Sequence, residues 1–276
     1  MSHSPSNHAG NDAPVGVFDS GLGGLCVLRE IRQRAPAERL LYLADHAHFP
    51  YGTRPLAEVR KFATQITRRL RAEGVKLITI ACNTASAAAL HQLREAFPYT
   101  PFVGMEPAVK PAVRSTGTGT VAVLATEATF QGELFSSLLE RFARDTAVLT
   151  QACPGLVELV EKGERYSARA HALLLRYVQP LLERGVDTLV LGCTHYSFLK
   201  KQLQHVAGPG VTIIDPAPAV AEQIIRVLSA NRLARSAPAE AAAPIVVCTT
   251  DRSLEARFSA QAHALLDEPV QVRAVK

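Results

Sequence analysis

Short apolar runs alternate along the chain with longer segments whose apolar residues recur at helical spacing. The short runs predict strands at Val15–Phe18, Leu40–Ala44, Val75–Ala81, Gly119–Leu124, Ala147–Thr150, Val186–Gly192, Val211–Ile214 and Ile245–Thr249. The longer segments predict helices at Leu25–Arg34, Leu56–Glu73, 85–98, Phe130–Arg144, Tyr166–Arg184, Val220–Leu228 and Leu254–Leu266. Strands that alternate with helices favour an α/β fold whose parallel sheets carry helices on both faces.

The alternation starts again half-way along the chain, which indicates an internal repeat. The segments LITIACNTAS and TLVLGCTHYS share an apolar strand, a small residue, a cysteine and a polar triplet, and their cysteines are Cys82 and Cys193. Two buried parallel strands can look alike by chance, but the shared polar ends favour a true repeat. We therefore predict two similar α/β domains related by a pseudo-two-fold axis, each of which points one cysteine into the cleft between them.

Two proline-containing crossings, near 104–107 and 215–219, indicate where the domains meet. We expect a first domain at 14–105 plus 217–276, which contains Cys82, and a second at 106–216, which contains Cys193. The polar residues 1–13 are expected to form a disordered lead-in, and the Pro/Ala-rich stretch 236–244 a surface loop.

The composition suits a protein with an ample core. The 276 residues are 47% hydrophobic and 20% charged, which fits one large or two medium domains. No apolar run approaches the ~20 residues of a membrane helix, and the N-terminal residues lack the apolar segment of a signal peptide. We expect a cytoplasmic protein without a membrane partner.

The net charge of +5 and the pI of about 9.1 raise the question of nucleic-acid binding. The basic residues are dispersed, and their densest cluster lies on the predicted helix Leu56–Glu73, where a solvated face is the simpler interpretation. The sequence contains neither an aromatic ladder beside this cluster nor a recognised nucleic-acid motif. We expect no nucleic-acid partner, although a positive protein can attract a small anionic substrate.

The five cysteines are odd in number, widely spread and without a CxxC pair. This pattern argues against a disulfide framework and against a zinc knuckle. A single free cysteine is more often a buried core residue than a reactive one. Cys82 and Cys193 differ from the others because they follow strands, and ligands of open α/β sheets bind beyond the carboxyl ends of the strands.

Other residues at strand ends supply further candidates for a binding site. They are Asp19, Ser20, Pro50, Tyr51, Gly52, Asn83, Thr84, Thr126, Thr194 and His195. Where a helix begins at such a place, its free N–H groups can hold a carboxylate without a cationic side chain. Helix capping alone would explain one such site, but two sites of the same design, each beside a cysteine, favour a functional role.

Two facing thiols suit acid–base chemistry on a carbon acid. Inversion of an amino acid requires removal of the α-proton on one face and its return on the other, which one thiolate and one thiol can do in both directions. A cysteine pKa near ~8.5 falls beside a cation or a helix N-terminus. Asp19 and His195 are the expected helpers of Cys82 and Cys193, although an isolated histidine is more often structural.

The motifs FDSGLGG, FPYG, ACNTAS and GCTHYS, in this order over residues 14–270, resemble those of the glutamate racemases in the cofactor-independent aspartate/glutamate racemase family. The resemblance implies that Cys82 and Cys193 are catalytic, that Asp19 assists the first and His195 the second. A glutamate near the second cysteine aligns with Glu161 in CPGLVELVE, with Glu158 as its rival. The substrate-contacting pairs of the family match Asp19-Ser20, Tyr51-Gly52, Asn83-Thr84 and Thr194-His195.

The same resemblance implies an activity and its requirements. It implies interconversion of L-glutamate and D-glutamate, a supply of D-glutamate for peptidoglycan in a bacterial cytoplasm, and no pyridoxal phosphate or metal. Homodimers are frequent in the family, so a homodimer is an expected form of this chain.

The chain departs from the family pattern at three positions. A serine, Ser197, replaces the proline of the motif CTHYP, which is expected to loosen the turn but to leave the reactive atoms in place. A threonine and an arginine of the family are replaced by His46 and His48. These histidines are expected to alter the rim of the pocket or its response to pH.

Several rival functions conflict with the sequence. The glycines after the first strand have the spacing GxGG rather than the GxGxxG of dinucleotide-binding proteins, and a tight turn explains them. A cysteine-dependent phosphatase needs an arginine six residues after its cysteine, where Ala88 and Leu199 stand. A zinc site from Cys82, Cys193 and His195 would occupy both thiolates.

Two alternatives to a racemase remain open. One is a Cys–His acyl-transfer hydrolase with Cys193 as nucleophile, in which Cys82 is dispensable. The other is a non-catalytic amino-acid-binding module between two α/β lobes, in which serine at either cysteine leaves binding intact.

Overall fold

The computed structural model describes residues 12–235, 243, 245–266, 268 and 270–275. The predicted disordered lead-in lies outside these residues except for 12–13, and the predicted Pro/Ala-rich loop lies outside them except for residue 243.

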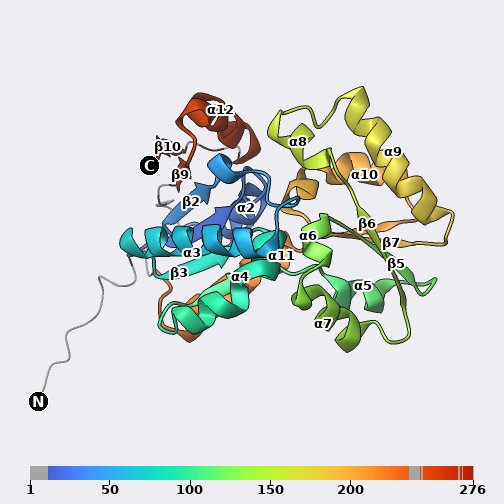
Figure 1. The fold of residues 1–276 in the computed structure, drawn as a ribbon, viewed down its shortest axis with the longest axis horizontal. Helices are drawn as coiled ribbons and strands as arrows, with labels where there is room; N and C mark the ends of the chain where they lie inside the picture. Colours follow the sequence, from blue (N-terminus) through green and yellow to red (C-terminus); the bar gives the residue numbers. More distant parts are fainter. Residues whose placement is uncertain (1–11, 236–242, 244, 267, 269, 276) are drawn as a thin grey trace, which may run out of the picture.

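The strands form two parallel sheets, one in each half of Figure 1. The first sheet has the order β10-β9-β2-β1-β3-β4 and the second the order β6-β5-β7-β8. The strands are β1 (Val15–Asp19), β2 (Leu40–Ala44), β3 (Leu77–Ile80), β4 (Phe102–Gly104), β5 (Thr120–Ala125), β6 (Ala147–Ala152), β7 (Thr188–Leu191), β8 (Thr212–Ile214), β9 (Ile245–Thr249) and β10 (Gln271–Ala274).

The order of the strands repeats between the sheets. The arrangement β2-β1-β3-β4 in the first sheet matches β6-β5-β7-β8 in the second, and every ladder is parallel. The third strand of each set, β3 or β7, is therefore in the same place in its sheet. Cys82 lies two residues after β3 and Cys193 two residues after β7. The predicted pair of similar α/β halves is confirmed.

Helices cover both faces of each sheet. They are α2 (Leu25–Arg34), α3 (Leu56–Ala72), α4 (Asn83–Ala96), α5 (Val109–Ser115), α6 (Glu127–Phe130), α7 (Glu133–Phe142), α8 (Leu156–Glu161), α9 (Ala168–Leu182), α10 (Lys200–Ala207), α11 (Ala217–Ala230) and α12 (Glu255–Leu266), with 3₁₀ turns η1 (His46–His48), η2 (Thr194–Leu199) and η3 (Arg252–Leu254). On the first sheet, α2, α11 and α12 share one buried cluster and α3 and α4 the other. On the second, α8, α9 and α10 lie in one cluster and α5 and α7 in the other.

Helix α3 illustrates how the apolar pattern produces this packing. Its buried side chains include Val59, Ala63, Ile66 and Leu70, which recur every three or four residues and therefore form one face of the helix. The helix stops before Gly74, whose φ of 75° is the left-handed conformation that commonly follows a helix end.

The predicted helix Phe130–Arg144 is wrong in its boundaries. The structure has two helices there, α6 and α7, with Gly132 between them. A Cβ on Gly132 would lie 2.6 Å from the Cβ of Ala87 on α4, so the break allows the second half to approach the first. The sequence analysis also missed β4, β10, α5, α8 and α10, which are too short to give a clear periodicity.

The chain leaves the first sheet after β4 and returns to it after β8. Helix α11 packs on α2, and β9 and β10 extend the first sheet beyond β2. On this ground we propose the domain limits 14–105 plus 217–276 and 106–216. None of the helices in the described residues is both long and apolar enough to cross a membrane.

Candidate active site

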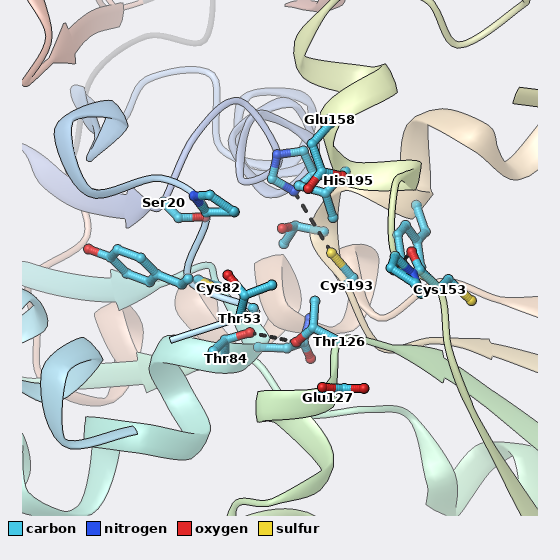
Figure 2. Close-up of a pocket in the computed structure, with 18 of the residues that line it drawn as sticks. Ser20, Thr53, Cys82, Thr84, Thr126, Glu127, Cys153, Glu158, Cys193 and His195 are labelled. Atoms are coloured by element: carbon cyan, nitrogen blue, oxygen red, sulfur yellow. Dashed lines mark hydrogen bonds between the residues drawn. The ribbon is translucent and has the colours of Figure 1, made fainter. Parts of the chain in front are cut away.

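A cavity of about 150 Å³ lies where the strands of both halves end (Figure 2). All the candidates from the strand ends line it, and these are Asp19, Ser20, Pro50, Tyr51, Gly52, Cys82, Asn83, Thr84, Thr126, Cys193, Thr194 and His195. Of the predicted site residues, Glu161 alone does not line the cavity. The repeat explains this convergence, because it brings equivalent strand ends from the two halves to one place.

The sequence analysis missed the loop after β6. Cys153, Pro154 and Gly155 line the cavity, and so does Glu158 on the following helix. The signal that could have found them is a Pro-Gly pair directly after a strand, which marks a turn at the same edge of the sheet. The thiol of Cys153 donates to the carbonyl oxygen of Gln151 at 3.4 Å, and Figure 2 shows its sulfur on the side away from Cys193.

Cys82 is held at the start of α4. Its Sγ accepts a hydrogen bond from the backbone N–H of Ala85 at 3.4 Å, as the N-cap of the helix. Burial is the main cause that raises the pKa of Cys82 well above its usual value, and the negative charge of Asp19 adds to it. The raised pKa favours the thiol form of Cys82, which can donate a proton.

Cys193 has a different partner. Its Sγ lies 3.8 Å from Nδ1 of His195, and Nε2 of the same ring lies 2.7 Å from Oε1 of Glu161. The three side chains form a line that runs from the cavity through His195 to Glu161. The arrangement is that of a thiol, a base and a carboxylate that orients the base.

In this line of side chains, Glu161 and His195 each stabilise the charged form of the other. Burial alone would raise the pKa of Glu161, but hydrogen bonds from His195 and His46 outweigh it and lower the pKa to about 2. Burial would likewise lower the pKa of His195, but Cys193 and Glu161 raise it well above its usual value. Because Glu161 is ionised, Nε2 of His195 carries a hydrogen, which leaves Nδ1 as the atom that exchanges a proton with the sulfur.

Asp19 connects the two half-sites. It is fully buried, and Oδ1 accepts from the backbone N–H of Ser20 at 2.6 Å. Oδ2 accepts from the hydroxyl of Thr194 at 2.8 Å, which joins the end of β1 to the residue after Cys193. The carboxylate is therefore positioned from both halves.

Three threonines contact one another at another side of the cavity, and two of them, Thr84 and Thr126, line it. The hydroxyl oxygens of Thr84 and Thr126 are 3.0 Å apart, and Thr129 lies 3.2 Å from the first and 3.0 Å from the second. Thr84 belongs to α4 and the other two to the second half, so this triangle also joins the halves. Figure 2 shows the contact between Thr84 and Thr126.

The cavity offers neutral donors to an anion. No lysine or arginine of the described residues lines it. Both polar atoms of the Asn83 side chain are buried and have no hydrogen-bond partner in the described part of the chain. A buried amide without partners costs free energy, which a bound carboxylate can offset together with the N–H groups at the start of α4.

The two candidate glutamates occupy different places. Glu161 ends α8 and lies behind His195, whereas Glu158 lines the cavity. Oε2 of Glu158 is buried and has no hydrogen-bond partner in the described residues. Only Glu161 of the two bonds His195 in this structure, which fits the role that the motif comparison implied for it.

The histidines and the serine that depart from the family motifs lie outside the cavity lining. His48 contacts Asp45 at 2.9 Å and stacks on Phe62 at a centroid distance of 3.9 Å. The hydroxyl of Ser197 donates to Oδ1 of Asp215 at 3.0 Å, so this bond holds the turn where the family has proline.

We predict that Glu161→Gln destabilises the protein in a manner that depends on pH. The pKa of Glu161 is about 2 in the folded protein against 4.5 ordinarily. Its stabilising contribution is therefore present above about pH 4.5 and is lost as the pH falls towards 2. The difference in free energy of unfolding between wild type and variant, measured by urea titration, should shrink over this range. A difference that stays constant with pH would show that His195 and His46 do not stabilise an ionised Glu161.

Comparison with known proteins gives one consistent result. The sequence matches the family model of Asp/Glu/hydantoin racemases over residues 23–224. A glutamate racemase from Ectopseudomonas mendocina is 52% identical over 231 residues, which cover 84% of this chain and 88% of that protein.

Solved structures agree with the sequence match. A glutamate racemase isoform from Bacillus anthracis superposes with a TM-score of 0.87 at 30% identity and covers 96% of this chain and 98% of that one. The glutamate racemase from Francisella tularensis in complex with D-glutamate has a TM-score of 0.83 at 27% identity, again over 96% of this chain and 98% of that one. These likenesses extend over both halves and therefore over both cysteines.

Proposed function

The chain belongs to the Asp/Glu/hydantoin racemase family and is an amino-acid racemase, and we propose that it interconverts L-glutamate and D-glutamate with Cys82 and Cys193 as its two proton-transferring groups. The observation that carries the proposal is the pair of thiols from equivalent strand ends that line one cavity. Each has its own partner, Asp19 for the first and His195 for the second.

The different partners suit a reaction that needs one base and one acid. Cys193 and His195 can share one proton as thiolate and imidazolium, because Glu161 stabilises the charged ring. The thiolate of Cys193 removes the α-proton, and the thiol of Cys82 donates its proton to the opposite face of the carbanion. The cycle leaves Cys193 as a thiol and Cys82 as a thiolate, which is the starting state for the other enantiomer.

The helper residues then restore the first state. The imidazolium of His195 releases its Nδ1 proton to solvent, and Nδ1 then accepts the proton of the Cys193 thiol, while Glu161 keeps Nε2 protonated. The Cys82 thiolate takes up one proton from solvent, so the protons balance. Asp19 is the carboxylate beside Cys82, and its charge favours return of a proton to that sulfur. The protein can therefore start a turnover with either enantiomer.

Glutamate as the substrate is supported by the relatives and by the cavity. The relatives described above are named glutamate racemases, and one of them holds D-glutamate. The amide of Asn83 and the hydroxyls of Ser20, Thr84 and Thr194 line the cavity and can receive two carboxylates. Asp19 offers a negative partner for the ammonium group.

We further propose that the product serves peptidoglycan synthesis in the cytoplasm, as the motif resemblance implies. The five cysteines are all free, which suits a reducing compartment.

The substrate proposal is tested by incubating the pure protein with L-glutamate in D2O without added cofactor. We expect the optical rotation to fall to zero while deuterium replaces the α-proton. L-aspartate run in parallel measures substrate preference, and a faster reaction with aspartate would contradict the assignment of glutamate. Neither loss of rotation nor exchange with either amino acid would refute the proposed racemase activity.

A further inference from the structure

His46 has no role in the mechanism above, yet it contacts Glu161, the residue that bonds His195 in the Cys193 half of the site. Its side chain is 4% exposed, and Nε2 lies 3.4 Å from Oε2 of Glu161. The opposite nitrogen, Nδ1, lies 2.8 Å from the hydroxyl oxygen of Thr249 at the end of β9. The ring is therefore held between a strand end of the first half and a carboxylate of the second.

Glu161 is shared between two histidines through different oxygens. Oε1 contacts His195 at 2.7 Å and accepts from the backbone N–H of Leu22 at 2.6 Å. Oε2 faces His46. Since the carboxylate is ionised, the His46 nitrogen that faces it carries a hydrogen, so both oxygens of Glu161 are satisfied and the group cannot rotate without losing partners.

The backbone of Glu161 is fixed from the same side. Nε2 of Gln261 on α12 donates to its carbonyl oxygen at 2.7 Å, and Arg257 donates to the same oxygen. Figure 1 shows α12 of the first half beside α8 of the second. The main chain is thus anchored independently of His46, which contacts the carboxylate only at Oε2.

We propose that His46 is a positioning residue for the Cys193 half-site: it fixes the Glu161 carboxylate so that His195 keeps its proton on Nε2 and presents Nδ1 to Cys193. The aromatic edge contact of His46 with Phe258, at 5.0 Å between centroids, sets the plane of the ring. His46 does not line the cavity, so it acts through Glu161 and His195 and not on the substrate. This inference rests on the proposed function.

Two substitutions separate the hydrogen bond from the volume of the side chain. His46→Gln can place an amide N–H near the position of Nε2, whereas His46→Leu fills the space without a donor and leaves Oε2 of Glu161 unpaired. We expect kcat of the leucine variant to fall about tenfold or more with KM unchanged, as when a group that orients a catalytic residue is removed. The glutamine variant should stay within about threefold of wild type. His91→Leu, at an exposed histidine of α4 that pairs with Glu95, is the control and should have wild-type kinetics.

A second measurement does not require turnover. Alkylation by iodoacetamide, followed by mass spectrometry of each cysteine, reports the thiolate fraction at Cys193 and uses Cys82 in the same molecule as reference. We expect His46→Leu to slow alkylation of Cys193 relative to Cys82, and His46→Gln to restore the wild-type ratio. Thr249→Val, which removes the hydroxyl behind His46, should change the ratio in the same direction and serves if the leucine variant does not fold.

The outcomes distinguish the two claims. A wild-type protein that does not racemise glutamate overturns the proposed function, while the alkylation ratio still tests His46. An active wild type with unchanged kcat and alkylation ratio in His46→Leu overturns the positioning role. Equal losses in the leucine and glutamine variants also overturn it, because the effect then follows from packing.

Discussion

Serine in place of Cys82 or Cys193 lowers the rate of glutamate racemisation by about 10³-fold or more, because a hydroxyl in these surroundings is neither a sufficient acid nor a sufficient base. Both thiols are nearly buried, with 6% and 8% exposure, so the smaller oxygen fits without disturbing the fold. The loss should be of similar size for both variants, since the proposed mechanism uses both sulfurs in each turnover.

The single variants also make a finer test of the two-base mechanism. Each retains one thiol and should still exchange the α-proton of one enantiomer for deuterium with retention of configuration. The two variants should act on opposite enantiomers, as proton NMR in D2O can measure. Cys248→Ser is the matched control, because Cys248 is also buried, with 2% exposure, but accepts from Arg273 outside the cavity.

The same experiment decides between the racemase and its alternatives. A Cys–His hydrolase would keep full activity with serine at Cys82, and a binding module would have no turnover to lose. Substantial racemisation by either serine variant, or exchange of the same enantiomer by both, would contradict the assignment of one sulfur to each face.

The sequence could predict the parts of the site that depend on local pattern. Each apolar strand is followed by its polar residues within the same short segment, so the strand ends at Asp19, Cys82 and Cys193 are visible without a structure. The repeat adds that two such ends occupy equivalent positions. Because parallel strands place their carboxyl ends along one edge, convergence of these residues follows from topology alone.

The sequence could not predict contacts between distant segments. Glu161 meets the backbone of Leu22 and the ring of His195 only because α8 of the second half packs against the loop after β1. The same packing also places His46, which departs from the family motif, beside Glu161. Short elements such as β4, β10 and α8 were missed for a related reason, since tertiary pairing and not periodicity determines them.

Gly23→Ala should remove most of the activity although Gly23 does not line the cavity. A Cβ at this position would lie 2.7 Å from Cε1 of His195 and closer still to its Nδ1 and to Oγ1 of Thr194. Two buried side chains would have to move, and one of them presents its ring nitrogen to Cys193. A displacement of about 1 Å at such a place can cost about 10²-fold in rate, and we expect kcat/KM to fall by at least this factor.

The matched control is Gly210→Ala, because a Cβ there meets nothing within 4 Å. Thermal unfolding of both variants separates loss of the fold from loss of geometry, and we expect Gly23→Ala to remain folded with a lower Tm.

Gly21→Ala tests the same effect at a second position, since its Cβ would overlap Oε1 of Glu161, the oxygen that contacts His195. Wild-type kcat/KM in the variant at Gly23 would mean that His195 need not be held where the structure has it. Gly21 and Gly23 of FDSGLGG thus leave room for side chains of the second half, which explains their presence without a nucleotide.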